Sequence, residues 1–331
     1  MRQGFQVTRT RTVTSSTLSA RRAFADDVRY YLTLSPRQLP SKHLYDALGS
    51  ALFDAITQLP WYALTRAESR LLQRHGRDVF DAMDGVSTVL ELGPGNGEKL
   101  LTLLDGEPRD RALDVYLIDV SESALARAVQ TLARRHETAV ICYEETYDAG
   151  LERFRTDRDS RRRALALFLG SNIGNFDPPG CEAFLRNLAS ALMPGDALLL
   201  GTDLVKPERD LLLAYDDPLG VTAAFNRNLL VRINRELDAD IDLDRFDHRA
   251  VWNESASRVE MHLVSRDAQV IRIPAARVEV TLGAGETIWT ESSYKYRPAD
   301  VVALLERNGF EVRAQWEDGA DPFALTLAAL R

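Results

Sequence analysis

The chain is poor in the residues that build metal centres and disulfide frameworks. Its 331 residues contain only two cysteines, Cys142 and Cys181, and the five histidines show no H-x-x-x-H pairing. We therefore expect no disulfide framework, no C-x-x-C zinc site and no other bound metal. The sequence also lacks any apolar run approaching the roughly 20 residues needed to cross a bilayer, so we expect no membrane partner.

Basic residues are outnumbered, with 41 Lys and Arg against 49 Asp and Glu and a formal net charge of −8. General nucleic-acid binding requires a basic face, so we expect no nucleic-acid partner. Residues 1–22 contain no acid and are rich in Arg, Ser and Thr. This composition superficially resembles a transit peptide. We interpret it instead as a flexible, polar N-terminal arm of a cytoplasmic protein.

Predicted strands alternate with predicted helices over most of the chain. Residues 23–80 have apolar positions at helical spacing, and the apolar runs that follow predict strands at 89–92, 115–118, 138–142, 164–169 and 197–202. This alternation predicts a parallel, doubly wound α/β sheet. It stops near Lys206 and resumes after Tyr294. We therefore expect one catalytic α/β domain, residues 23–205 and 288–331, interrupted by a β-rich domain at 206–287.

A glycine-rich turn follows the first predicted strand, in the sequence Glu91-Leu92-Gly93-Pro94-Gly95-Asn96-Gly97-Glu98-Lys99. Glycine lets the backbone approach a ligand closely, because it has no side chain and adopts positive φ. A dinucleotide fingerprint requires a third glycine where this chain has Glu98, and a Walker A loop requires Gly before and Ser or Thr after Lys99. The remaining pattern, E-x-G-x-G-x-G, is typical of class I methyltransferases. We expect Gly93, Gly95 and Gly97 to wrap the methionine part of S-adenosylmethionine.

Two more residues belong to the expected cofactor site. Asp119 ends the second predicted strand, where an acidic residue accepts hydrogen bonds from ribose hydroxyls in analogous dinucleotide sites. The alternative for Asp119 is a helix N-cap, although Ser121 is the predicted cap of that helix. Lys99, one of only four lysines, either binds the carboxylate of the cofactor or lies on the surface of the first helix.

Seven segments outside the glycine turn carry a more specific resemblance. They are Leu44-Tyr45-Asp46, Leu59-Pro60-Trp61-Tyr62 with Thr65-Arg66, and the ranges 168–176, 214–216, 222–226, 260–263 and 290–296. Together they resemble the L-histidine Nα-methyltransferases of ergothioneine biosynthesis, which convert histidine to its trimethylammonium betaine, hercynine. The resemblance implies a class I methyltransferase (Rossmann-like) fold with an inserted substrate-binding domain. It also implies that S-adenosylmethionine is the methyl donor and that L-histidine is the substrate. We expect the protein to be a monomer.

The resemblance assigns roles to individual residues. It implies that Asn175 and Tyr215 bind the substrate carboxylate, and that Tyr45 lies beside the amino group. Asn175 could instead cap the following helix, and Tyr215 could be a core aromatic. Thr146 and Tyr147 stand where the family usually has an acidic residue and an aromatic that contact adenine. Glu145 or Asp148 are the acids that could substitute there.

The same resemblance implies that Tyr62, Glu291 and Ser293 surround the imidazole and that Met261 packs near it. Glu291 and Ser293 are two residues apart on a predicted strand, so both side chains face the same way. A carboxylate and a hydroxyl can satisfy both nitrogens of a neutral imidazole. The alternatives are an exposed strand acid, a surface serine, a core tyrosine at 62 and a flexible core methionine. Trp61 and Ala63 flank Tyr62 differently from the commonest family pattern.

The resemblance also implies three successive methylations of one amine. One alternative is a related methyltransferase for another amino acid such as tryptophan, which an apolar residue at position 291 would favour. Another is a nicotinamide-dependent oxidoreductase, which Glu98 opposes. A third is a non-catalytic partner subunit, which the intact glycines and Asp119 oppose.

Overall fold

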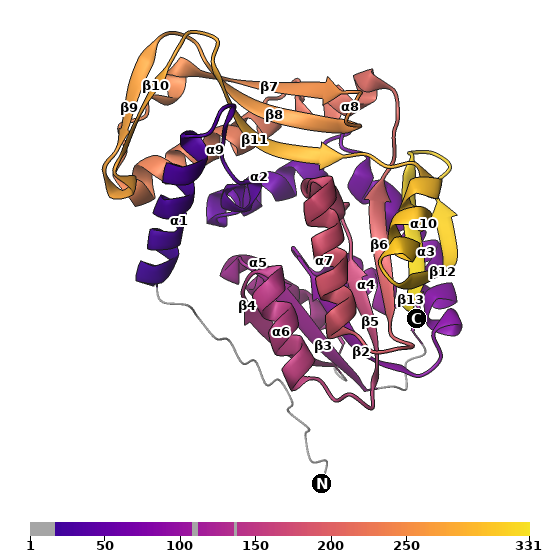
Figure 1. Cartoon of the computed structure of the whole chain (residues 1–331). Helices are drawn as coiled ribbons and strands as arrows, with labels where there is room; N and C mark the ends of the chain where they lie inside the picture. The colour runs from indigo at the N-terminus through magenta and orange to yellow at the C-terminus, as the bar shows by residue number, and fades with distance from the viewer. Residues whose placement is uncertain (1–16, 108–111, 136–137) are drawn as a thin grey trace. The chain divides into compact units, whose positions relative to one another are not determined.

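The structure is a computed structural model that describes residues 17–107, 112–135 and 138–331. These residues form two compact units, whose elements are labelled in Figure 1. The first unit contains Leu64–Leu204 and Tyr296–Arg331, and the second contains residues 17–63 and Val205–Lys295.

The first unit is built on a seven-stranded sheet with the order β12-β13-β6-β5-β2-β3-β4. The strands are β2 (Val86–Leu92), β3 (Leu113–Asp119), β4 (Thr138–Glu144), β5 (Arg163–Phe168), β6 (Ala197–Asp203), β12 (Phe310–Glu317) and β13 (Phe323–Leu330). Neighbouring strands from β4 to β6 are parallel, whereas β13 is antiparallel to both β6 and β12. The predicted doubly wound α/β sheet is confirmed.

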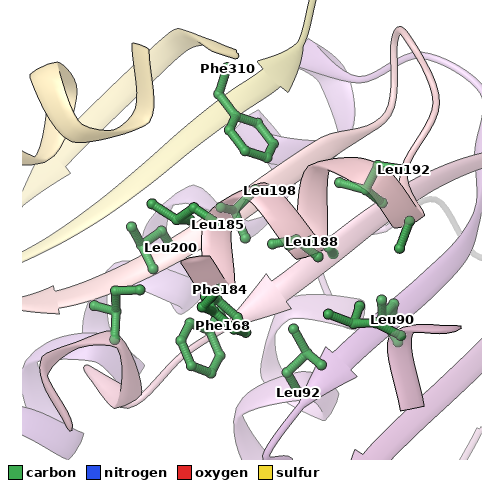
Figure 2. Close-up of a cluster of buried hydrophobic side chains, with 14 of the residues drawn as sticks. Leu90, Leu92, Phe168, Phe184, Leu185, Leu188, Leu192, Leu198, Leu200 and Phe310 are labelled. Atoms are coloured by element: carbon green, nitrogen blue, oxygen red, sulfur yellow. The ribbon is translucent and has the colours of Figure 1, made fainter. Parts of the chain in front are cut away.

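Helices pack on both faces of this sheet. They are α3 (Leu64–Ala82), α4 (Glu98–Leu104), α5 (Glu122–Leu132), α6 (Tyr147–Asp157), α7 (Pro178–Ala191) and α10 (Pro298–Arg307), with a short 3-10 turn, η2 (Asn172–Asn175). On one face, side chains of α6, α7 and α10 pack against the sheet and form a single apolar cluster with it. Figure 2 shows Phe184 and Leu188 of α7 beside Phe168 of β5 and Leu198 of β6. Each such buried side chain stabilises the fold by about 1.5–3 kcal/mol.

Alternation along β2 sends its side chains to opposite faces of the sheet. Leu90 and Leu92 belong to the apolar cluster of Figure 2. Glu91 therefore points to the other face, where it interacts electrostatically with Lys99 of α4 and Glu68 of α3. A carboxylate is thus buried directly beneath the glycine-rich turn.

The second unit combines a four-stranded sheet, β1-β11-β8-β7, with a two-stranded hairpin, β10-β9. The strands are β1 (Arg37–Gln38), β7 (Phe246–Asn253), β8 (Arg258–Ser265), β9 (Gln269–Ile273), β10 (Val278–Leu282) and β11 (Thr287–Tyr294). Its helices are α1 (Thr17–Leu32), α2 (Ala47–Thr57), α8 (Glu208–Tyr215) and α9 (Val221–Leu237), with 3-10 turns η1 (Ser41–Leu44), η3 (Leu243–Arg245) and η4 (Pro274–Ala276). Helices α8 and α9 both pack against β7 and β8. Every second residue of β8, including Val259, Met261 and Leu263, is buried.

The two units divide the chain differently from the predicted domains. Residues 17–63, expected in the catalytic domain, belong to the second unit because β1 pairs with β11 and α2 packs against α9. Strand β11, expected after the insertion, also belongs to the second unit because it pairs with β8. Of the expected arm at 1–22, residues 1–16 lie outside the described residues, and residues 17–22 form part of helix α1.

Within the described residues, no helix is both long and apolar enough to span a membrane. Across residues 17–107, 112–135 and 138–331, no three His, Cys, Asp or Glu side chains gather into a group that could hold a metal ion. Cys142 and Cys181 are both buried and form no disulfide.

Candidate active site

The turn after β2 places its three glycines in the left-handed region. The φ angles are +72° at Gly93, +58° at Gly95 and +77° at Gly97. A β-carbon at Gly97 would lie 2.9 Å from the Cα atom of Ala128, whereas one at Gly95 would meet no atom of the described residues within 4 Å. Packing against α5 therefore requires the glycine at 97. At 95, the open space lets a ligand approach the backbone.

Tyr147, the first residue of α6, lies against this turn. A β-carbon at Gly93 would lie 2.8 Å from Tyr147 Oη, and the Tyr147 ring packs edge-on to Phe168 at 5.5 Å between centroids. Burial, followed by the charges of Asp119 and Glu91, raises the pKa of Tyr147, so its hydroxyl stays neutral. The structure thus places Tyr147 at the glycine turn.

Three polar residues flank Tyr147 in the sequence. Thr146 is the exposed N-cap of α6 and its side chain makes no capping hydrogen bond. Glu145 forms an ion pair with Arg153 at 2.8 Å. Asp148 accepts a hydrogen bond from Asn187 Nδ2 at 2.6 Å. The carboxylates of Glu145 and Asp148, the two acids that could substitute for the acidic residue of the family, therefore interact with neighbouring protein side chains.

Asp119 ends β3, next to the glycine turn, because the Gly93 amide donates to the carbonyl of Ile118 at 2.9 Å. Its Oδ1 accepts from the Ser121 amide at 2.8 Å, and burial raises its pKa to about 6. Helix α5 is capped by Ser121, whose side chain accepts from the Ala124 amide. The predicted cap at Ser121 is confirmed, and the N-cap interpretation of Asp119 is wrong.

A cluster of two acids and one lysine lies beneath the turn. Lys99 Nζ lies 2.5 Å from Glu68 Oε2, and Glu68 Oε1 accepts from the Gly170 amide at 2.7 Å. The Glu68 side chain is 0% exposed. Burial raises the pKa of Glu91 to about 8, although Lys99 opposes the shift. Lys99 is therefore not a free surface residue.

Sequence reasoning missed Glu68. The available signal was its position on the apolar face of α3, where Leu64, Leu71 and Leu72 are also buried. An acid on that face is seldom buried without a partner. Nothing in the sequence pattern, however, pointed to Lys99 of α4 as that partner.

In the second unit, residues far apart in the sequence form a polar–aromatic cluster. Its members are Tyr45, Tyr62, Tyr215, Met261, Glu291 and Ser293. Ring contacts connect Tyr45 to Phe53 at 5.6 Å, Phe53 to Tyr62 at 6.2 Å, and Tyr62 to Tyr215 at 6.3 Å. A hydrogen bond of 2.8 Å then joins Tyr215 to Ser293. The structure thus brings together all the predicted substrate residues that belong to this unit.

A β-bulge in β11 determines how Glu291 is presented. The register with β8 shifts between Trp289 and Glu291, and Glu291 lies opposite Met261. Thr290 and Glu291 are consequently both buried, and alternation then continues with Ser293. Exposure is 9% for Glu291 and 5% for Ser293, so the exposed interpretations of both residues are wrong. Burial raises the pKa of Glu291 to about 7, with Lys295 opposing the shift.

Lys295 is a second residue that sequence reasoning missed. Its Nζ donates to Tyr215 Oη at 2.8 Å and to Ser293 Oγ at 2.9 Å, and it lies 4.6 Å from the Tyr215 ring centroid. Only 3% of the residue is exposed. The available signal was a rare lysine that follows Glu291 and Ser293 at the same two-residue spacing.

Asn175 lies in the first unit, at the end of η2 after β5. The following helix, α7, is capped by Asp177, whose side chain accepts from the Gly180 amide. The alternative interpretation of Asn175 as that cap is therefore wrong. Its predicted contact with the substrate carboxylate stays a prediction.

A family model described as a histidine-specific, S-adenosylmethionine-dependent methyltransferase matches residues 24–330. The chain belongs to this family. It is 44% identical over 314 residues to a histidine N-alpha-methyltransferase of Mycolicibacterium smegmatis, covering 94% of this chain and 96% of the relative. It is 30% identical over 293 residues to ergothioneine biosynthesis protein 1 of Schizosaccharomyces pombe, covering 85% of this chain and 37% of that protein.

Among solved structures, the chain is similar to a glycopeptide N-methyltransferase crystallised with S-adenosylmethionine. The identity is 17%, the TM-score is 0.40, and the match covers 78% of this chain and 94% of the other. A likeness this low carries no argument about the site. The class I fold rests instead on the strand order of the first unit and on the family.

Membership of this family of methyltransferases makes the chain an S-adenosylmethionine-dependent enzyme. The first unit fits that cofactor on its own geometry. Gly95 has open space beside it. Glu91 Oε2 is buried and has no hydrogen-bond partner in the described part of the chain, which suits it to accept from an ammonium group. Asp119, with a pKa of about 6, is ionised at neutral pH and can accept from hydroxyls.

Proposed function

We propose that the chain transfers three methyl groups from S-adenosylmethionine to the α-amino group of L-histidine. The product is hercynine, and the reaction is the first step of ergothioneine biosynthesis. The family description supports histidine as substrate. The names of the mycobacterial and fungal relatives support Nα-methylation and the ergothioneine pathway.

The observation that carries the choice of histidine is the buried pair of Glu291 and Ser293. A neutral imidazole has one donor and one acceptor nitrogen, which this pair can satisfy together. A phenyl ring would leave both buried groups unpaired, at a cost on the order of 1–3 kcal/mol each. The pair therefore favours a ring with two polar atoms.

The remaining substrate residues surround that ring and the amino-acid backbone. Tyr62 and Met261 contact the ring, and Asn175 and Tyr215 bind the carboxylate. Tyr45 lies beside the amine, where tyrosine faces stabilise the growing ammonium by roughly 1–2 kcal/mol. Tyr215 gives its hydroxyl hydrogen to Ser293 and accepts from Lys295, so the charge that attracts a carboxylate to Tyr215 is that of the Lys295 ammonium beside it.

The cofactor supplies a methyl group already activated on a sulfonium. Gly93, Gly95 and Gly97 wrap its methionine part, and Glu91 accepts from its ammonium. Asp119 accepts from its ribose hydroxyls. Lys99, Thr146 and Tyr147 complete the proposed binding site. The protein's contribution is alignment, a dry cavity and an unprotonated amine, so no covalent nucleophile is required.

Tryptophan is the less favoured substrate. Its indole has a single N–H donor and no acceptor, so either Glu291 or Ser293 would lose its partner on binding. We also propose that the enzyme is a cytoplasmic monomer.

Mass spectrometry of reaction products tests the proposal. The purified protein is incubated with S-adenosylmethionine and each of the twenty amino acids separately. We expect a histidine product heavier by three methyl groups and no comparable product from the other amino acids. Methylation of another amino acid in preference to histidine would overturn the assignment of Glu291 and Ser293.

A further inference from the structure

We propose that Lys295 is a positioning residue that makes the site accept a single tautomer of the neutral imidazole ring. It does so by fixing the direction of the hydrogen bonds at Ser293. This inference rests on the proposed function, because it takes the ring of the substrate to lie between Ser293 and Glu291. It assigns to Lys295 a role that the predicted site did not include.

The hydrogen bonds around Ser293 carry the inference. Ser293 Oγ accepts from Tyr215 Oη at 2.8 Å and from Lys295 Nζ at 2.9 Å. A serine hydroxyl has two acceptor positions and one hydrogen, and a lysine ammonium is only a donor. Both acceptor positions of Ser293 are therefore filled, and its own hydrogen is directed to neither partner. Toward a ligand, Ser293 can only donate.

Lys295 also orients Tyr215. It donates to Tyr215 Oη at 2.8 Å, and Tyr215 in turn donates to Ser293. The Lys295 ammonium thus donates to both hydroxyls, and the three side chains form a closed cycle of hydrogen bonds. All three side chains are buried, and a polar group in such surroundings is held in place because breaking its hydrogen bonds is costly.

The carboxyl of Glu291 does not set this direction by itself. A protonated carboxyl donates and an ionised one only accepts, so Glu291 alone is compatible with either ring orientation. Once Ser293 must donate, the ring nitrogen beside it has to lack a hydrogen. The other nitrogen then carries the N–H and donates to Glu291. An imidazolium ring, with two donors, is excluded.

Nitrogen NMR of the bound ring tests this directly. The wild-type enzyme is saturated with S-adenosylhomocysteine, so that no methyl transfer occurs, and L-histidine labelled with ¹⁵N in the ring is added. We expect one protonated and one unprotonated nitrogen, as in a single fixed tautomer. Two protonated nitrogens, or the averaged signals of exchanging tautomers, would overturn the inference. This measurement needs no variant.

Variants then assign the effect to Lys295. In Lys295→Met, a side chain of similar length loses all its donors, so Ser293 regains an acceptor position. We expect KM for histidine to rise on the order of 10- to 100-fold, with a smaller change in kcat and a mixture of tautomers by NMR. The control is Lys42→Met, which removes an ammonium that is 53% exposed in the same unit. It should change neither KM nor the spectrum.

A double-mutant cycle separates positioning from general stabilisation. Because Lys295 acts through Ser293, adding Lys295→Met to Ser293→Ala should raise KM little further. If the two substitutions instead raise KM by independent factors that multiply, and the ring spectrum is unchanged in Lys295→Met, the role of Lys295 is structural and the inference is overturned. The two proposals fail separately. A wild-type enzyme that does not methylate histidine refutes the function, whereas one that methylates histidine bound as imidazolium refutes only the role of Lys295.

Discussion

Each unit holds a buried acid with a raised pKa close to a lysine, but the two lysines are used differently. In the first unit, Lys99 forms an ion pair with Glu68 and interacts electrostatically with Glu91. In the second unit, Lys295 donates to two neutral hydroxyls and interacts with Glu291 through charge. The first lysine is shared between two acids, and the second faces one.

This difference matches the ligands proposed for the two units. If both acids were ionised, one lysine would leave one negative charge uncompensated. Because the pKa of Glu91 is about 8, Glu91 instead binds a proton at neutral pH. A cationic ligand favours the ionised form of such an acid. One acid and one lysine are balanced, which suits a neutral ring. The acids and the lysine of each cluster thus suit the charge of its proposed ligand.

The substitution with the largest expected effect weakens cofactor binding in the first unit and leaves the second unit unchanged. In Gly95→Ala, the new methyl group meets no atom of residues 17–107, 112–135 and 138–331 within 4 Å, so we expect it to collide with a ligand held against the backbone. We expect the affinity for S-adenosylmethionine, measured by calorimetry, to fall on the order of 100-fold, since overpacking a filled site costs about 1–3 kcal/mol.

The matched control is Gly85→Ala. Gly85 also has positive φ, +79°, and open space around its Cα, so both variants pay the same backbone cost of about 1–2 kcal/mol in stability. Cofactor affinity should stay at the wild-type level in Gly85→Ala. Equal losses of affinity in the two variants would show that the glycine turn does not contact the cofactor.

The next effect breaks the second unit alone. Glu291→Gln keeps the shape of the side chain but removes the charge that accepts the ring N–H. We expect kcat/KM for histidine to fall on the order of 10- to 50-fold, with no change in cofactor affinity. The control is Glu260→Gln, since Glu260 lies on the neighbouring strand opposite Ser292. A comparable loss in that control would contradict the assigned role of Glu291.

The two units also differ in how far the sequence reveals them. The proposed cofactor residues of the first unit are close together in the chain, and several have a local signature, such as glycines in a turn or an acid at a strand end. Physical reasoning from these patterns reached Gly93, Gly95, Gly97 and Asp119. It missed Glu68, whose partner Lys99 lies 31 positions further along the chain.

The polar–aromatic cluster of the second unit could not be assembled from local patterns. Its members extend from Tyr45 to Ser293, and only the family resemblance grouped them. The bulge at Thr290, which turns Glu291 inward, depends on pairing with β8. The assignment of residues 17–63 to this unit depends on the pairing of β1 with β11. Long-range pairing of this kind leaves no periodic signal in a single sequence.

The smallest expected effect sharpens the comparison through pH. Burial raises the pKa of Asp119 from 3.8 to about 6, and hydroxyl groups that donate to the carboxylate lower it again when the cofactor binds. We therefore expect the cofactor to bind more tightly above pH 6 than below it. By linkage, affinity should fall by up to about tenfold between pH 7 and pH 5, because the free enzyme takes up a proton that the complex resists.

Asp119→Asn isolates this contribution from that of Glu91, the other acid with a raised pKa near the turn. Glu91 should still strengthen binding of the cationic cofactor as pH rises through about 8, because its ionisation supplies the missing negative charge. Calorimetric titrations from pH 5 to pH 9 should therefore show two rises in affinity for the wild type and only the upper one for Asp119→Asn. Histidine affinity, in contrast, should follow Glu291 and be unaffected by Asp119→Asn. If Asp119→Asn keeps the rise in cofactor affinity near pH 6, Asp119 does not accept from the cofactor, and the role predicted for the acid at the end of this strand is wrong.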